Sequence, residues 1–231
     1  MKVFVFDPLA TDFSAVLRPP SLTHLLGTDQ LGRDVAARLT AGGVTTLGLT
    51  VTTVLITALA GTVIGMLGHR LLIRVADLLA ALPAVLIGLV AAAVLGPGLP
   101  SVLVAVCLTG WTPFARQAHH LTVRESGRDY VTAARSLGAG RTRVLARHIL
   151  PNVAGALLAH LYLRFAGTLL TVSGLSFLGL GVQPPTPEWG AMVADGRAYL
   201  FTAPHLVLAP AVAVVLVATA ATVAGRRLER R

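Results

Sequence analysis

DYVTAARSLGAGRTRVLARHILPN, residues 129–152, is a polar, arginine-rich stretch between two long hydrophobic ones. Its first half places small and apolar residues on one helical face, at the spacing i, i+3, i+4 and i+7: Tyr130, Ala133, Ala134 and Leu137. Gly138 and Gly140 then break the helix, and a second helical stretch over Arg141–Ile149 is expected to end at Pro151. The segment therefore predicts a helical hairpin that offers a small-residue face to a partner.

The surrounding chain is that of an integral membrane protein. Hydrophobic residues make up 55% of it and charged residues 13%. The 25 residues from Val44 to Gly68 carry no formal charge, which is long enough for a helix to cross about 30 Å of hydrocarbon. Four further spans are predicted, giving an all-α protein with about five transmembrane helices: Leu78–Leu95, Gly98–Ala115, Pro151–Leu180 and Leu206–Ala224.

The basic residues lie beside these spans. Of the 19 Lys and Arg, 18 are Arg, and seven of them fall between Arg116 and Arg147. Four more Arg close the chain, whereas residues 182–205 hold one Arg against two acids. The positive-inside rule therefore puts residues 116–150 and the C-terminus in the cytoplasm, and residues 1–43, 96–97 and 182–205 outside. Membrane topology explains the basic balance better than nucleic-acid binding does, so no nucleic-acid partner is expected.

The hairpin resembles the cytoplasmic EAA loop of ABC importer permeases. That pattern has Glu-Ala-Ala, a later Gly and then Leu-Pro, and the matching positions here are Thr132, Ala133, Ala134, Gly138, Leu150 and Pro151. Thr132 stands where the family has Glu, and His148 stands where an apolar residue is usual. The spacing is intact. By this resemblance Tyr130, Leu137 and the matched positions would couple the chain to an ATPase.

Three more stretches resemble the dipeptide, oligopeptide and nickel branch of that family. They are GTDQLGRD at residues 27–34, DLLAALPAVL at 77–86 and GLSFLGLGVQPPTPEWGAM at 174–192. The resemblance implies a type I ABC importer transmembrane domain in the cytoplasmic (inner) membrane. Such a subunit would form half of the pathway for a peptide, nickel or metal chelate. Its partners would be a homologous permease subunit, two ABC ATPase subunits, an extracytoplasmic solute-binding protein and the lipid bilayer.

The chain lacks the residues of an ATPase. Lys2 is its only lysine, so there is no Walker A lysine, and no Gly-rich phosphate loop is present. ATP and Mg are therefore expected on partner subunits, and no cofactor on this chain. No metal site is expected either, because the adjacent His119 and His120 point to different faces of a helix.

The chain divides into an external N-terminal segment, residues 1–43, and a helical transmembrane domain, residues 44–231. Only Val3–Phe6 is apolar before Asp7, which is too short for a signal peptide or a span. Relatives generally have a helix upstream of the GTDQLGRD-like stretch. We therefore expect either that the start of this chain is truncated or misassigned, or that it is a five-helix variant.

Four residues are candidates for contact with the binding protein: Asp29, Arg33, Asp34 and Trp189. Gly27–Leu39 is predicted to be a capped surface helix with the i, i+4 pairs Asp29 to Arg33 and Asp34 to Arg38. The alternative is a solvated charged face. The proline-rich external loop 182–205 is expected to fold over the membrane surface with Trp189 as an interfacial anchor, or to be a plain connection.

Arg164 and His160, one turn apart, fall inside the fourth span and are the candidates for the translocation pathway. Arg164 lies about 20 Å along a helix that starts near Pro151, which is deep in the hydrocarbon. Such a charge is expected to face a cavity or an acid of the partner subunit, or to snorkel toward the headgroups.

Two other classes of function remain open at this point. An intramembrane serine protease is prompted by Ser176 near Gly174, although G-L-S-F-L is not a nucleophile elbow and no oriented His or Asp partner is evident. A stand-alone channel or an assembly factor is the other. The sequence does not identify the solute.

Overall fold

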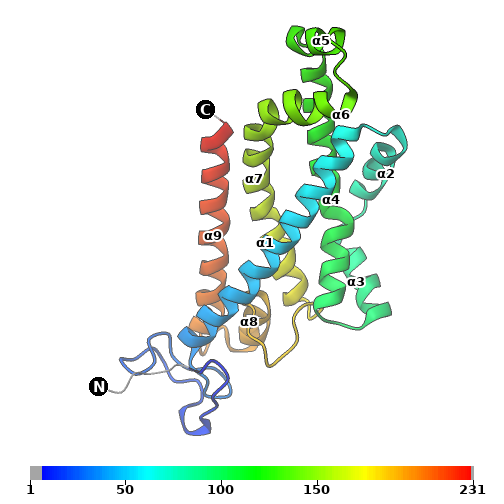
Figure 1. The fold of residues 1–231 in the computed structure, drawn as a ribbon. Helices are drawn as coiled ribbons and strands as arrows, with labels where there is room; N and C mark the ends of the chain where they lie inside the picture. The colour runs from blue at the N-terminus through cyan, green and yellow to red at the C-terminus, as the bar shows by residue number, and fades with distance from the viewer. Residues whose placement is uncertain (1–6, 230–231) are drawn as a thin grey trace.

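The computed structural model describes residues 7–229, and within that range it is helical without strands. Figure 1 shows long helices packed side by side, with short helices at both ends. The helices are α1 Val35–Leu67, α2 Arg70–Ala80, α3 Ala84–Leu95, α4 Leu99–Ser126, α5 Asp129–Ser136, α6 Arg141–Val144, α7 Leu150–Phe177, α8 Trp189–Gly196 and α9 His205–Glu229. Short 3-10 turns lie at Phe13–Ala15 and Arg197–Tyr199, and a π-helical turn at Leu145–Ile149. Val3–Phe6, Arg230 and Arg231 lie outside the described residues.

Helix α1 begins nine residues before the predicted span. Asp34 caps it, since its Oδ1 accepts a hydrogen bond from the backbone N–H of Ala37 at 2.8 Å. The helix ends at Gly68, whose φ of 64° is left-handed. The predicted helix over Gly27–Leu39 is therefore wrong in its first half, where residues 27–34 form a loop.

Helix α1 packs along α4 at very close range. A Cβ added at Gly61 would lie 2.7 Å from the Cβ of Phe114, and one added at Gly65 would lie 2.9 Å from the Cβ of Ala118. Small residues four apart thus let the two backbones approach, as in other membrane helix pairs.

The second predicted span is broken. Helices α2 and α3 meet at an angle of 90° across a short break before α3. Pro83 is the N-cap of α3, where a missing N–H costs no helical bond. Within residues 7–229 there are therefore four helices long and apolar enough to cross a membrane, or up to five if the bent pair counts as one span.

The hairpin runs directly into α7, so the predicted helix end at Pro151 is wrong. Pro151 lies in the first turn of α7, directly after the π-helical turn Leu145–Ile149. A π turn is wider than an α turn, which eases the clash of the proline ring with the preceding turn. Figure 1 shows the chain crossing the end of the bundle from α6 before it turns into α7.

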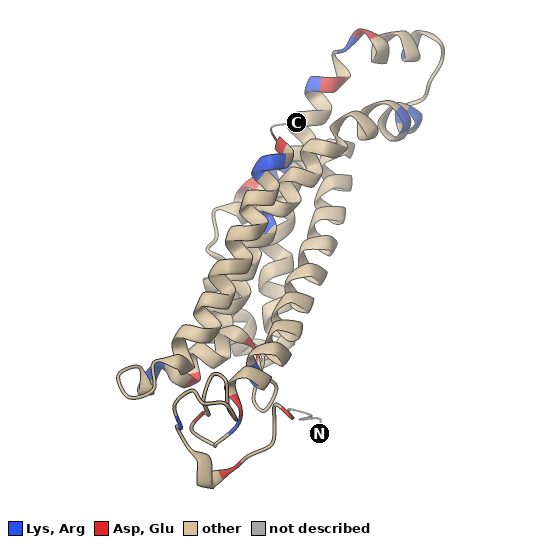
Figure 2. Cartoon of the chain, turned by 90° about the vertical axis from the view of Figure 1, so that its left-hand side faces the viewer, with Lys and Arg blue, Asp and Glu red and all other residues tan. Residues whose placement is uncertain are grey.

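The two ends of the bundle differ in charge. Helices α5 and α6 and the C-terminus lie at one end, called here the hairpin end, while α8 and the N-terminal segment lie at the other, the α8 end (Figure 1). Figure 2 shows Arg gathered toward the hairpin end, where a few Asp and Glu lie among them, and acidic and basic residues in more even numbers at the α8 end. The segments that the positive-inside rule assigned to one side therefore lie together in the fold.

Candidate functional site

The hairpin is held by its own small core. Val131 of α5 is fully buried and packs in one cluster with Val144, Ile149 and Val153. Ala133 and Leu137 are exposed, Leu137 to 89%, and Ala134 is partly exposed. Helix α5 therefore turns Val131 inward and leaves small and apolar residues uncovered at the tip of the molecule.

Tyr130 belongs only partly to that exposed face. Its hydroxyl donates to Glu125 Oε1 at 2.9 Å and accepts from Asn152 Nδ2 at 3.3 Å. Desolvation, followed by the hydrogen bond and charge of Glu125, raises the pKa of Tyr130. The side chain therefore ties the ends of α4 and α7 to α5, a role that its spacing in the sequence did not reveal.

The remaining hairpin positions shape the turn. Gly138 ends α5 with a φ of 84°, a left-handed conformation that favours glycine. Thr132, which stands where the family has Glu, is exposed and carries no charge. Its hydroxyl donates to the carbonyl of Arg128 at 3.4 Å. Leu150 and Pro151 form the start of α7 and are exposed.

A second feature is a polar cavity of about 290 Å³ between α4, α7 and the bend of α2 and α3. Arg164 lines it, together with Arg116 and four threonines: Thr109, Thr112, Thr168 and Thr171. Arg164 thus lines a half-open cavity between the helices. His160 does not line this cavity. Its ring packs edge-on against Phe114, with the centroids 5.2 Å apart.

Sequence reasoning missed Arg116 and the threonines. They follow a readable pattern, because Arg164, Thr168 and Thr171 are spaced i, i+4, i+7 on α7. Thr109, Thr112 and Arg116 show i, i+3, i+7 spacing on α4. Each helix therefore carries one polar stripe, and the fold brings the two stripes together.

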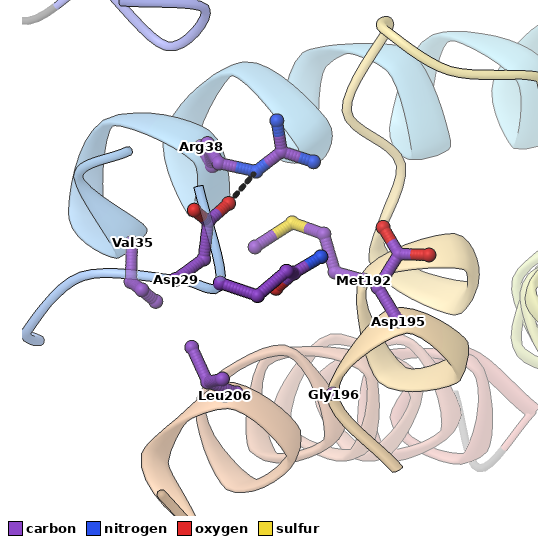
Figure 3. A pocket seen from close by; sticks show the side chains of 8 residues that line it. Asp29, Val35, Arg38, Met192, Asp195, Gly196 and Leu206 are labelled. Atoms are coloured by element: carbon purple, nitrogen blue, oxygen red, sulfur yellow. Dashed lines mark ion pairs between the residues drawn. The ribbon is translucent and has the colours of Figure 1, made fainter. Parts of the chain in front are cut away.

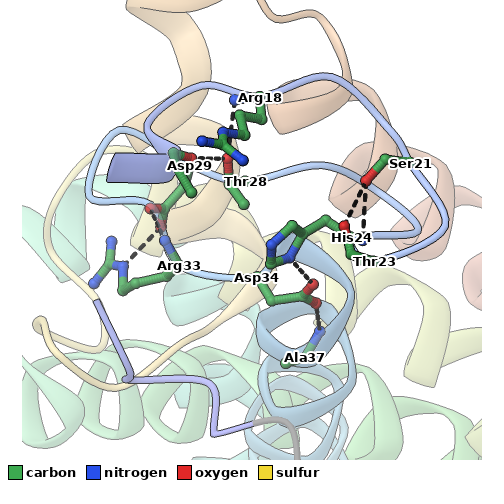
Figure 4. A network of polar contacts seen from close by, with 10 residues as sticks. Arg18, Ser21, Thr23, His24, Thr28, Asp29, Arg33, Asp34 and Ala37 are labelled. Atoms are coloured by element: carbon green, nitrogen blue, oxygen red, sulfur yellow. Dashed lines mark hydrogen bonds and ion pairs between the residues drawn. The ribbon is translucent and has the colours of Figure 1, made fainter. Parts of the chain in front are cut away.

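At the α8 end, the predicted charged surface is buried. Asp29, Arg33 and Asp34 are between 5% and 8% exposed. Asp29 Oδ2 accepts from Arg33 Nε at 2.7 Å and lies 3.4 Å from Arg38 Nε, so Arg38 pairs with Asp29 and not with Asp34. Asp34 instead contacts His24 Nδ1 at 2.8 Å and caps α1 (Figure 4). These charges hold the loop before α1 in place.

Arg38 also faces a small cavity of about 20 Å³ under α8, and its Nη1 has no hydrogen-bond partner among the described residues. Figure 3 shows Asp195 of α8 beside the same space. The pKa of Asp195 is raised above its usual value, because the effect of burial exceeds the opposing effect of the nearby Arg38 and Arg33 charges.

Trp189 is not an interfacial anchor. It is 6% exposed, and its Nε1 donates to the carbonyl of Leu39 at 2.8 Å. The neighbouring Glu188 is fully buried, accepting from Thr46 Oγ1 and from the N–H of Ala191, both at 2.9 Å. The loop 182–205 is therefore anchored to α1 inside the protein, and the expectation of a membrane-surface anchor is wrong.

The protease alternative has no support in the geometry. Ser176 is 2% exposed, and its Oγ has no hydrogen-bond partner among residues 7–229. A serine nucleophile needs a base within hydrogen-bond reach.

Comparison with known proteins identifies the family. The family "Binding-protein-dependent transport system inner membrane component" matches residues 53–231. The glutathione transport system permease protein GsiD of Pectobacterium atrosepticum is 35% identical over 221 residues, covering 93% of this chain and 73% of that protein. The di/tripeptide transport system permease protein DppC of Pseudomonas aeruginosa is 36% identical over 224 residues, covering 91% and 74%.

Solved structures give the same fold. A chain of the inward-facing MetNI methionine ABC transporter superposes with a TM-score of 0.67 at 16% identity, covering 84% of this chain and 95% of that one. A second crystal form gives a TM-score of 0.66. The predicted all-α transmembrane domain of an ABC importer is thereby confirmed, as is a multi-pass inner-membrane location. The chain belongs to the family of binding-protein-dependent transport system inner membrane components, as an ABC importer permease subunit.

Proposed function

We propose that this chain forms half of the translocation pathway of an importer for small peptides or peptide-like solutes. The relatives named for glutathione and for di- and tripeptides support this solute class. The other half would be a homologous permease subunit. Two ABC ATPase subunits would carry ATP and Mg, and an extracytoplasmic binding protein would deliver the solute.

The observation that carries the proposal is the uncovered face of α5. Ala133, Ala134 and Leu137 are small or apolar, lie at the tip of the hairpin end and contact little of the rest of the chain. An exposed apolar helix face of this kind can bind in a groove on a partner protein, with side chains spaced i, i+3 and i+4 as the contacts. Gly138, Thr132, Leu150 and Pro151 would set the angle at which the helix is presented, and Tyr130 would brace it. Docking there would put the ATPases on the arginine-rich, cytoplasmic side.

At the α8 end, the four buried residues predicted to contact the binding protein would contribute to its binding only indirectly. Asp29, Arg33, Asp34 and Trp189 hold the N-terminal loop and α8 in place. A binding protein would therefore meet the exposed residues around them, and these four would keep that surface in shape.

The experiment is an Ala134→Trp substitution in the complete complex. A tryptophan at this partly exposed position should overfill the groove and uncouple ATP hydrolysis from uptake, while the hairpin core around Val131 stays intact. Arg135→Trp is the matched control, because Arg135 is exposed and lies on the side of the same helix opposite the centre of this face. ATPase activity and solute uptake are measured together in proteoliposomes. Normal coupling in Ala134→Trp contradicts docking through this face, and uptake that continues without ATP indicates a channel.

A further inference from the structure

The cavity between α4 and α7 carries two cations without an acid among its lining residues. Arg116 and Arg164 both line it, and among residues 7–229 no Asp, Glu, His or Cys does. Arg164 has no ion-pair partner among residues 7–229. Arg116 lies 3.8 Å from Asp77, a pair in which both side chains are about half exposed and which therefore neutralises little. The cavity is electropositive.

Three threonine hydroxyls of the cavity donate their protons to backbone carbonyls of their own helices. Thr109 Oγ1 donates to the carbonyl of Ala105 at 2.9 Å, and Thr171 Oγ1 donates to that of Gly167 at 2.9 Å. Thr112 donates in the same way within α4. A hydroxyl has one proton, so the oxygens of the partly exposed Thr109 and Thr171 keep lone pairs that can accept from a ligand, whereas Thr112 is buried.

The lining therefore matches a ligand with a negative group and N–H donors. A carboxylate can form charge-assisted hydrogen bonds with a guanidinium, and the threonine oxygens can accept from amide or ammonium N–H groups. A bare divalent cation meets two positive charges and no ligand of the usual kind, and no group of three metal-ligating residues occurs within residues 7–229.

We propose that this cavity binds the carboxylate of the solute, with Arg164 and Arg116 as the carboxylate-binding residues, and thereby excludes bare divalent metal ions from the pathway. The inference rests on the proposed function, whose solute class it specifies. It also accounts for an arginine deep in α7, because a charge at that depth is retained where it has a partner or a polar cavity.

The test is a protection assay that needs neither transport nor the binding protein. The purified complex carries Thr168→Cys as the probe position in the cavity, with the native Cys107 replaced by alanine. The rate at which N-ethylmaleimide alkylates this cysteine is measured in the presence of dialanine, of dialanine amide or of Ni²⁺, and a slower rate indicates protection. Dialanine should protect the cysteine at a concentration about tenfold to a hundredfold lower than dialanine amide does. This is the ratio of affinities expected from one charge-assisted hydrogen bond. Ni²⁺ should not protect.

Variants then assign the effect. Arg164→Gln should abolish the preference for dialanine, and Arg164→Lys should restore part of it. Arg226→Gln, an exposed arginine near the end of α9 that does not line the cavity, should keep it.

Four results of the protection assay would overturn the inference. They are equal protection by dialanine and its amide, no protection by either, protection by Ni²⁺, and a preference that survives Arg164→Gln. Loss of the partner permease from the purified Arg164→Gln complex would likewise overturn it, since Arg164 would then pair with an acid of that partner. ATP-dependent uptake by the unmodified complex is measured separately. Protection without any uptake would contradict the proposed function and leave the carboxylate site standing.

Discussion

Replacing Gly65 by alanine should weaken the packing of α1 on α4. The added Cβ would meet the backbone carbonyl of Ala115 and lie 2.9 Å from the Cβ of Ala118. Carbon atoms in good contact are about 3.5–4.0 Å apart, so the helices would have to separate by roughly 1 Å. Neither contact is the end of a flexible side chain that could swing away. Overpacking of this kind costs about 1–3 kcal/mol.

Gly48→Ala is the matched control. Gly48 lies in the same helix, but a Cβ added there meets nothing within 4 Å. Both substitutions remove a glycine from a helix, which by itself favours folding by about 1 kcal/mol. The difference between the two variants therefore isolates the packing, and Gly65→Ala should be less stable than Gly48→Ala by about 1–3 kcal/mol.

The assay is reversible unfolding of the purified chain in mixed micelles, followed by circular dichroism, with the two variants measured side by side. Equal stability of Gly65→Ala and Gly48→Ala would refute the close approach of α1 and α4 at this point. Gly61→Ala should behave like Gly65→Ala, because its Cβ would lie 2.7 Å from that of Phe114.

Two further predictions concern topology and α8. In a chain without Cys107, Pro97→Cys and Ala191→Cys should react with an impermeant reagent from outside sealed cells, because both positions are at least partly exposed. Ser126→Cys should react only from the cytoplasm. External labelling of Ser126→Cys would contradict the arginine-based topology. Glu188→Ala should cost about 2–4 kcal/mol of stability, because it removes the cap of α8 and the acceptor of the buried Thr46 hydroxyl. Glu188→Gln keeps an acceptor oxygen and should cost less in the same unfolding assay, and an unaltered midpoint in Glu188→Ala would show that this buried contact contributes nothing.

The sequence by itself determined the features that depend on local chemistry. Hydrophobic stretches long enough to cross a bilayer located the long helices, with errors at their ends. The spacing of Ala133 and Ala134 before Gly138 located α5 and its turn, because helical periodicity and glycine conformation are local properties. The placement of arginines grouped the segments of the hairpin end, which the fold does bring together.

Only the tertiary structure decided how distant segments meet. The burial of Asp29 and Trp189 follows from the packing of the N-terminal loop and α8 on α1, and no window of sequence contains both partners of such a contact. The bend between α2 and α3 could not be seen in hydropathy, since both halves pass as one apolar stretch. The cavity required two polar stripes, around Arg116 on α4 and Arg164 on α7, to face each other. The sequence of each helix shows its own polar stripe. The cavity between the stripes depends on how the two helices are rotated and how far apart they lie, which long-range packing sets.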